Sequence, residues 1–246
     1  MAKLVIAVSR FVMTGMNRLQ VHGRERLDDV APERKGRGLL TVSNHVSLFD
    51  DPLLLANFVR GPYRNLRWVG ADAINFFGSA PKAWLFTAGR GVPIIRGTAG
   101  IDQPGMRFLR DRLIEGEWVH MFPEGGRTRD PEAKMLSEFR GGTGWLIAET
   151  NPVVLPFYHY GMHQVLPVSA VRPRSGNTVA VRFGEQVDCG EAWVGETALR
   201  RVGHAVAGVA LWDALAAELR DRLHEIERQT HPAFSGEQVK PAGVTD

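Results

Sequence analysis

The amino-acid sequence predicts an α/β fold, with a mixed, mostly parallel central sheet flanked by helices. Short apolar runs typical of strands alternate with helical segments along most of the chain, and such alternation indicates a sheet that is covered by helices. The 246 residues, of which 44% are hydrophobic, suffice for one large domain with a buried core. Since neither an internal repeat nor a second block of distinct composition is present, we expect a single domain over residues 21–230.

The expected strands are short runs of Leu, Val, Ile and aromatic residues that end at turn residues or charges. These runs fall at residues 39–42, 66–69, 92–95, 118–122, 153–158 and 178–183.

Helical segments fill most of the stretches between these strands. They are expected at about 50–58, within 71–87, near 102–115, at 143–149 and, as one long helix, from about 196 to 229, with a loop over 123–140. One apolar group within them is expected to pack in the core, with an acyl-chain groove or membrane contact as the alternatives: Phe76, Phe77, Trp84, Leu85 and Phe86. A second group is expected in the core, with a partner-helix face as the alternative: Leu211, Trp212, Leu215, Leu219 and Leu223.

The amino terminus predicts an amphipathic helix over residues 1–20. Basic Lys3, Arg10 and Arg18 are interspersed among apolar residues at helical spacing, namely Leu4, Val5, Val8, Phe11, Val12, Met16 and Leu19. Such a helix can lie in a membrane interface; the alternative is a helix packed on its own domain. No uncharged apolar run of about 18–20 residues is present and no cleavable signal peptide is recognisable, so we expect monotopic membrane association.

The last segment, residues 231–246, is rich in Pro, Gly and polar residues and is expected to be a disordered tail.

Composition narrows the classes of function. The single cysteine, Cys189, excludes an internal disulfide and a metal site built from several thiolates. The formal net charge is +3, and most of the basic residues are Arg. The guanidinium group of Arg suits bidentate binding of phosphate and other oxyanions. GC-rich coding, which favours Arg over Lys, is the alternative explanation. No long basic run with interleaved aromatic residues occurs, so nucleic acid is not an expected partner.

The most informative segment runs from Asn44 to Pro52, directly after the strand expected at 39–42. It places His45 five positions before Asp50. On a continuous helix, residues five apart are separated by roughly 140°, so these side chains can meet only if His45 lies on the turn before the helix. A carboxylate there would fix the tautomer of a neutral imidazole and stabilise the imidazolium formed later. His45 would then be a general base and Asp50 its orienting acid.

The proton acceptor would act on a hydroxyl group of the substrate, because no nucleophilic serine in a Gly-x-Ser-x-Gly motif is present. The pattern therefore favours general-base catalysis of acyl transfer to an alcohol. A purely structural alternative is a capping box, in which Ser47 caps the helix and Asp50 is its third residue. Asp50 could serve both purposes with one carboxylate oxygen for each, and Asp51 is expected to be a helix-start charge.

Two further strand ends carry charged residues. In the segment from Phe122 to Arg129, Gly125 and Gly126 allow backbone amides to approach an anion beside Arg side chains. The segment from Gly91 to Gly97 ends its strand at Arg96. Ligands of open α/β sheets bind at the carboxyl ends of strands. One of these strand ends offers the possible base His45 and the other two offer Arg side chains, so we expect a ligand-binding site at this edge of the sheet.

Taken in order, these segments resemble the motif blocks of the glycerolipid acyltransferases, defined by a His-x4-Asp block and a Phe-Pro-Glu-Gly block. The resemblance is closest to the tafazzin branch and covers roughly residues 20 to 168. The matching segments are 21–25, 44–52 with its doubled aspartate, 91–97, 122–125, 146–149, 155–162 and 165–167.

The resemblance implies a lysophospholipid acyltransferase or transacylase that moves a fatty acyl group to the free glycerol hydroxyl of a lysophospholipid, in phospholipid remodelling. His45 would deprotonate this hydroxyl and Asp50 would orient His45. The two later blocks would bind the acceptor, with Arg96 and Glu124 as contacts and with Gly125 and Arg127 beside them.

No cofactor is implied beyond the acyl donor, which is a phospholipid ester or a thioester of coenzyme A or acyl carrier protein. The implied partners are phospholipids, lysophospholipids and the membrane surface, and the oligomeric state is left open, with a homodimer as one option. The implied location is the bacterial cytoplasmic membrane, or a mitochondrial membrane in a eukaryote.

Arg127 is a departure from the tafazzin pattern, because it resembles the Arg that lysophosphatidate acyltransferases carry after Pro-Glu-Gly. It favours the alternative of a 1-acyl-glycerol-3-phosphate acyltransferase dependent on acyl-CoA or acyl-ACP. Two other classes remain open: a metal-dependent hydrolase using His45, Asp50 and Asp51, although no His-Glu-x-x-His spacing occurs, and a lipid-binding module without catalysis.

Overall fold

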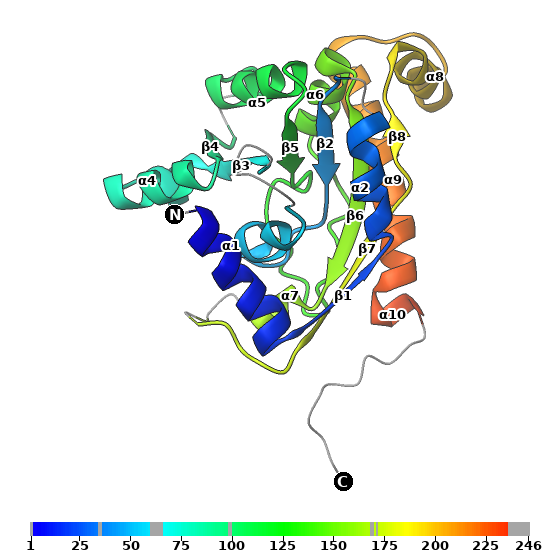
Figure 1. The fold of residues 1–246 in the computed structure, drawn as a ribbon. Coiled ribbons are helices and arrows are strands. Elements are labelled where there is room, and N and C mark those ends of the chain that lie inside the picture. The colour runs from blue at the N-terminus through cyan, green and yellow to red at the C-terminus, as the bar shows by residue number, and fades with distance from the viewer. Residues whose placement is uncertain are drawn as a thin grey trace.

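A computed structural model describes residues 2–33, 36–59, 66–97, 100–167, 170 and 172–235, and Figure 1 shows their arrangement. Within these ranges, eight strands form one sheet with the order β1-β7-β6-β2-β5-β3-β4, and β8 pairs with β6. The strands are β1 (Arg18–His22), β2 (Leu39–Val42), β3 (Trp68–Asp72), β4 (Gly91–Ile94), β5 (Trp118–Met121), β6 (Val153–Tyr160), β7 (Thr178–Phe183) and β8 (Val187–Asp188). Strand β6 is antiparallel to β7 and β8, whereas the other pairs are parallel. The expected mixed, mostly parallel sheet is confirmed.

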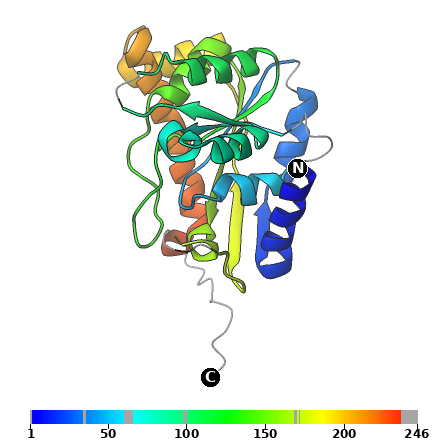
Figure 2. The same cartoon turned by 90° about the vertical axis from the view of Figure 1, so that its left-hand side faces the viewer.

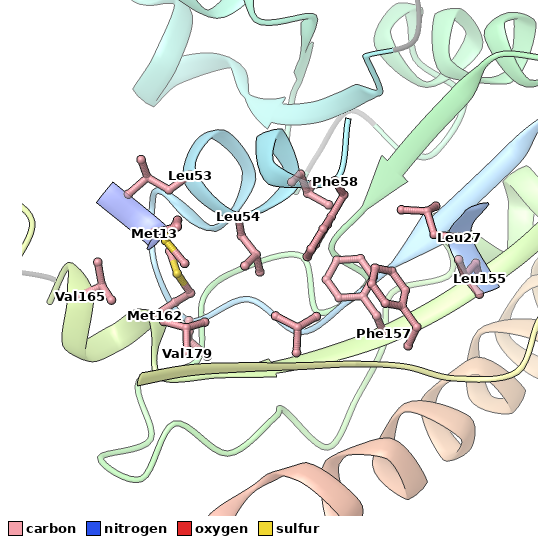
Figure 3. Packing of buried hydrophobic residues seen from close by; sticks show 14 of the residues in the cluster. Met13, Leu27, Leu53, Leu54, Phe58, Leu155, Phe157, Met162, Val165 and Val179 are labelled. Atoms are coloured by element: carbon pink, nitrogen blue, oxygen red, sulfur yellow. The ribbon is translucent and has the colours of Figure 1, made fainter. Parts of the chain in front are cut away.

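Alternate side chains of the strands face two separate cores. On one face, Leu155 and Phe157 of β6 pack with side chains of η1 (a π-helix, Phe11–Met16), α2 (Arg24–Glu33), η2 (a π-helix, Asp50–Leu54) and η3 (a 3₁₀ helix, Leu55–Asn57). Figure 3 shows Met13 of η1 among Leu53, Leu54 and Met162 in this core.

The opposite face of the sheet is covered by α5 (Pro104–Ile114), α6 (Gly142–Thr150) and α9 (Gly208–Thr230). Val154 and Tyr158 of β6 point into this second core, together with Leu215, Leu219 and Leu223 of α9. The expected core position of these leucines is therefore confirmed.

One edge of the sheet collects the carboxyl ends of four parallel strands. Val42 of β2 is in register with Met121 of β5, and Asp72 of β3 is in register with Ile94 of β4. The segments that leave these strands carry His45, Phe122 and Arg96. The register thus brings the three predicted site segments to one end of the sheet.

The helix expected over residues 1–20 is shorter than predicted. Helix α1 (Ala2–Arg10) and η1 end at Met16, and Arg18–His22 form β1, which the sequence interpretation missed. α1 packs against η2 and η3, and Val12 and Met13 are buried, whereas Val8 and Phe11 are 49% and 64% exposed. The segment therefore packs on its own domain with one side and exposes apolar side chains on another. No helix among the described residues has both the length and the apolar character needed to cross a membrane.

The long helix expected from about 196 to 229 is two helices. α8 (Glu191–Val202) ends at Gly203, whose φ of +85° is the left-handed conformation that commonly terminates helices, and α9 begins at Gly208. The short helices α7 (Met162–Val165) and α10 (Pro232–Ser235) were also not expected.

The helical stretch expected within 71–87 is also divided, into α3 (Ala73–Phe77) and α4 (Ala80–Ala88). Neither helix contains a buried residue. The core packing predicted for the aromatic group between Phe76 and Phe86 is therefore wrong, because these helices lie outside both cores.

The carboxyl-terminal segment is ordered beyond the expected boundary at residue 231. His231 is buried, and its Nε2 lies 2.7 Å from the carbonyl oxygen of Glu132. The folded part thus includes at least the start of the segment expected to be disordered, and the remainder, residues 236–246, lies outside the described residues.

Candidate active site

His45 and Asp50 are in direct contact, as their spacing predicts. His45 lies on the turn between β2 and η2, and its Nδ1 is 2.9 Å from Oδ2 of Asp50. The Asp50 side chain is 1% exposed and that of His45 is 18% exposed. His45 lines a cavity of about 1130 Å³, and within the described chain its Nε2 has no hydrogen-bond partner. With Nδ1 donating to the carboxylate, Nε2 carries the lone pair that a general base requires.

A single oxygen of Asp50 makes all the polar contacts of this carboxylate. Oδ2 accepts hydrogen bonds from the main-chain N–H groups of Val46 (2.7 Å) and Ser47 (2.8 Å) as well as from His45. Oδ1 has no partner among the described residues. Burial acts to raise the pKa of Asp50, but His159 and His45 outweigh it, so the pKa lies below its ordinary value and Asp50 is ionised.

The capping-box alternative is only half formed. Asp50 does accept the main-chain N–H of Ser47, but the Ser47 hydroxyl donates to the carbonyl oxygen of Leu166 at 3.1 Å. The helix also begins at Asp50 rather than at the residue after Ser47. The expectation of one carboxylate oxygen for each role is therefore wrong, because Oδ2 serves both.

A buried side-chain clamp holds the turn from behind. The Asn44 amide donates to the carbonyl oxygen of His159 (2.9 Å) and its Oδ1 accepts the His159 main-chain N–H (3.0 Å). The His159 ring is fully buried, and its Nε2 donates to the carbonyl oxygen of Asn44 at 3.1 Å while lying 3.8 Å from Oδ2 of Asp50. Burial lowers the pKa of His159, so a neutral imidazole sits beside the Asp50 carboxylate.

The loop after β5 fixes His45 from the other side. The Phe122 ring stacks on the imidazole at 4.1 Å between centroids, with an interplanar angle of 19°. The carbonyl oxygen of His45 accepts the N–H of Thr128 at 2.8 Å. The His45 imidazole and its peptide group are thus both held in place beside the cavity.

Glu124 has a different place from the one expected. Its side chain is buried at 4% exposure and is absent from the cavity wall. Oε1 accepts the main-chain N–H of His45 (2.7 Å), and Oε2 accepts the N–H of Leu136 (2.8 Å). Burial raises the pKa of Glu124 to about 8. The expected substrate contact is thus replaced by a brace that joins the turn of His45 to the loop around Leu136.

Gly125 lies in the cavity wall with a φ of +67°. A Cβ at this position would come within 2.4 Å of Cδ of Arg140, so any side chain would displace that arginine. The Gly125 carbonyl oxygen accepts a hydrogen bond from Nη1 of Arg96 at 3.1 Å. Gly125 therefore permits the close approach of two arginines.

Four arginines line the same cavity as His45: Arg96, Arg127, Arg129 and Arg140. Arg96 forms an ion pair with Asp72 at the end of β3, whereas for the other three guanidinium groups no acceptor is found within the described ranges. Burial lowers the pKa of Arg127, with Arg129 and Arg96 acting in the same direction. Unpaired, crowded guanidinium groups favour an anionic ligand.

Arg140 was not identified from the sequence, because no motif surrounds it and only the fold places it here. Its main-chain N–H donates to the carbonyl oxygen of Pro123 at 2.9 Å, which folds the long loop back onto the third motif segment.

Asp51 lies in the first turn of η2, as expected for a helix-start charge, and it is also an ion-pair partner. Both of its carboxylate oxygens are engaged by the guanidinium group of Arg67, which is buried at 4% exposure. Asp51 is therefore not available as a metal ligand, which the alternative of a metal-dependent hydrolase requires. In the described ranges, no three His, Cys, Asp or Glu side chains are grouped so as to hold a metal ion.

Comparison with known proteins gives a consistent picture. A family model described as Acyltransferase matches residues 18–160. Tafazzin from Drosophila melanogaster is 31% identical over 227 residues, which cover 89% of this chain and 59% of that protein. N-acylphosphatidylethanolamine synthase from Arabidopsis thaliana is 34% identical over 178 residues, which cover 67% of this chain and 60% of that protein. The chain thus spans about three fifths of the length of these curated relatives.

Among solved structures, the 1-acyl-sn-glycerophosphate (LPA) acyltransferase PlsC from Thermotoga maritima has a similar fold. The TM-score is 0.58 at 21% sequence identity, and the match covers 92% of this chain and 80% of that one. At this level of identity, the similarity concerns the fold alone.

Proposed function

Since the chain belongs to the acyltransferase family, we propose that it moves a fatty acyl group to the free glycerol hydroxyl of a lysophospholipid. The observation that carries this proposal is His45, paired with the buried Asp50 at 2.9 Å, in the wall of a cavity that four arginines also line. The tafazzin relative and the N-acylphosphatidylethanolamine synthase relative support a phospholipid substrate.

In the proposed reaction, Nε2 of His45 removes the proton of the acceptor hydroxyl as its oxygen attacks the acyl carbonyl carbon of the donor. A new C–O ester bond forms, and the C–O or C–S bond to the donor breaks. The imidazolium returns the proton to the leaving alkoxide or thiolate. Asp50 stabilises the imidazolium between these two transfers.

The arginines would bind the phosphate of the lysophospholipid. Arg127 is the strongest candidate, because it is half-buried and its guanidinium group has no acceptor within the described chain. Arg96 would contribute through its exposed side, since one side of its guanidinium group is held by Asp72 and Gly125. Gly125 would keep the space between these cations open.

The proposed reaction needs no resident cofactor, and its donor is a phospholipid or an acyl thioester. We expect the protein to act while bound to a membrane surface as a monotopic protein, on the bacterial cytoplasmic membrane or a mitochondrial membrane. The exposed apolar residues Val8 and Phe11 of the amino-terminal segment support this location.

The decisive experiment incubates the pure protein with labelled phospholipid and lysophospholipid, with and without acyl-CoA. His45→Ala should lower acyl transfer by about 10²- to 10⁴-fold and leave vesicle binding unchanged. His204→Ala, which changes an exposed histidine outside the cavity, should behave as wild type. Turnover retained by His45→Ala would refute the proposed mechanism. Transfer without a thioester identifies a transacylase.

A second candidate is a 1-acyl-glycerol-3-phosphate acyltransferase that uses acyl-CoA or acyl-ACP. The unpaired Arg127 favours it, because a terminal phosphate monoester carries more charge than the phosphodiester of other lysophospholipids. Strict dependence on a thioester, with preference for lysophosphatidate, would select this candidate.

A further inference from the structure

The pair of helices α3 and α4 combines an apolar sequence with an absence of buried side chains. Ile74, Trp84 and Leu85 are 81%, 65% and 50% exposed. A helix pair usually gains its stability by burying an apolar face against a core, and these two helices bury theirs in neither core. Exposed apolar surface of this kind marks a docking site.

Apolar side chains also line the cavity that holds His45. Phe76 and Phe86 of the helix pair and Leu48 are among its lining residues. Leu48 and its neighbour Phe49 are both exposed and lie just before η2.

The amino-terminal segment extends the same surface. α1 packs against η2 and, with η1, exposes Val8 and Phe11. Figure 2 shows α1 (dark blue) and α3–α4 (cyan to green) on the face turned towards the viewer. The docking surface, as we define it, comprises Val8, Phe11, Leu48, Phe49, Ile74, Trp84 and Leu85.

The charged residues in these segments indicate which partner binds the docking surface. Within residues 2–16 and 73–89 the charged residues are Lys3, Arg10 and Lys82, and no Asp or Glu occurs. Basic residues among exposed Trp, Phe and Leu are the pattern of segments that lie in the interface of anionic bilayers. A second copy of this chain would place these cations against one another, which opposes a symmetric dimer at this face.

We propose that α3–α4 is a second membrane-docking element, which together with α1 and with Leu48 and Phe49 seats the mouth of the cavity on an anionic phospholipid bilayer. This inference rests on the proposed function, because a lipid substrate would then pass from the bilayer to His45 between apolar walls. Phe76, Phe86 and Leu48 provide these walls, so the acyl chains stay out of water along the path.

The test replaces apolar side chains of the helix pair that lie outside the cavity wall. The variant Ile74→Glu/Trp84→Glu/Leu85→Glu is compared with the control Ile114→Glu/Leu199→Glu/Val209→Glu, whose side chains are 61%, 59% and 60% exposed on α5, α8 and α9. Flotation with phosphatidylcholine vesicles is measured with and without phosphatidylglycerol. Circular dichroism melts verify that both variants are folded.

Wild type and the control are expected to float with the anionic vesicles, and the helix-pair variant to lose vesicle partition by about tenfold or more. Bromine-labelled lipid should quench the fluorescence of wild type more than that of Trp84→Phe. Equal flotation of the two triple variants, or equal quenching of wild type and Trp84→Phe, would overturn the proposal. A dimer in light scattering that only the helix-pair variant dissociates would assign the surface to self-association instead.

Failure of docking and failure of the proposed function can be told apart. Turnover is measured in parallel on a short-chain lysophospholipid below its critical micelle concentration, where no surface is needed. The helix-pair variant should match wild type in this assay. If it floats like wild type while both forms turn over substrate, only the docking proposal fails. If wild type floats but turns over no lysophospholipid with any donor, only the proposed function fails.

Discussion

The main-chain N–H of His45 donates to Oε1 of Glu124 at 2.7 Å, and Oε2 of the same carboxyl group accepts the N–H of Leu136 at 2.8 Å. One buried side chain thus ties the turn that carries the proposed base to the loop that delivers Arg140. We therefore expect Glu124 to affect catalysis through the position of His45, without lining the cavity.

The Glu124 brace predicts a specific dependence of stability on pH. Burial raises the pKa of Glu124 from an ordinary 4.5 to about 8, so between these values the folded state binds more protons than the unfolded state. The free energy of unfolding must then fall as pH rises through this window. A difference of one pKa unit corresponds to about 1.4 kcal/mol, and we expect at least this loss relative to Glu124→Gln in urea titrations. Parallel pH profiles of the two proteins would contradict it.

Asp50→Asn should lower kcat by about 10²- to 10⁴-fold, somewhat less than the loss of His45. The amide oxygen can still accept the N–H groups of Val46 and Ser47, but the amide no longer stabilises an imidazolium. Asp51→Asn provides the matched comparison, because Asp51 lines the same cavity but its carboxylate pairs with Arg67 rather than with His45. This variant should lower thermal stability more than kcat. A kcat loss of equal size in both variants would argue against the assigned roles.

We expect kcat to fall when the ring N–H donor of His159 is removed. His159→Phe leaves the buried Asn44 carbonyl oxygen without its donor and removes a polar ring 3.8 Å from Oδ2 of Asp50. We expect kcat to fall by about tenfold and KM to change little. His159→Gln, which keeps an N–H donor, should restore most of kcat. Equal losses in the two variants would leave only a packing role.

Arg127→Gln should raise KM for an anionic lysophospholipid by about tenfold and change kcat less, since it removes a charge-assisted contact with the phosphate. Arg110→Gln is the control, because Arg110 is also half-buried but pairs with Asp111 on α5, outside the cavity. Initial rates over a range of lipid concentrations separate the two parameters. An unchanged KM in Arg127→Gln would indicate that another arginine binds the phosphate.

The parts of the site that follow strand ends could be predicted from the sequence. Apolar runs gave β2, β4 and β5 to within a residue or two, and the parallel register then brings His45, Arg96 and Phe122 together. The contact between His45 and Asp50 was also predictable, because both lie within one turn and a helix start. Local spacing was sufficient for these features.

The remaining parts depend on contacts that sequence spacing does not encode. Asn44 and His159 lie 115 positions apart, and their pairing exists only because β6 runs beside β2. Glu124 has the sequence of a charged loop, yet two main-chain donors bind the oxygens of its carboxyl group in the interior. The aromatic side chains of α3 and α4 have a composition typical of buried residues. Whether they are buried depends on which other elements pack against these two helices, and the spacing of residues in the sequence does not encode those contacts.

Strand β1 gives the amino-terminal segment a structural role besides the membrane contact that we propose for it. It lies at the end of the strand order and pairs along its whole length with β7, from Arg18 opposite Thr178 to His22 opposite Arg182. A shortened chain that begins after Gly23, a natural choice for removing a membrane-binding helix, would leave without partners those N–H and C=O groups of β7 that face β1, while the groups that face β6 keep theirs. Unpaired groups at the edge of a sheet can pair with a strand of another chain. We therefore expect the truncated protein to aggregate, because β1 no longer covers this edge of β7.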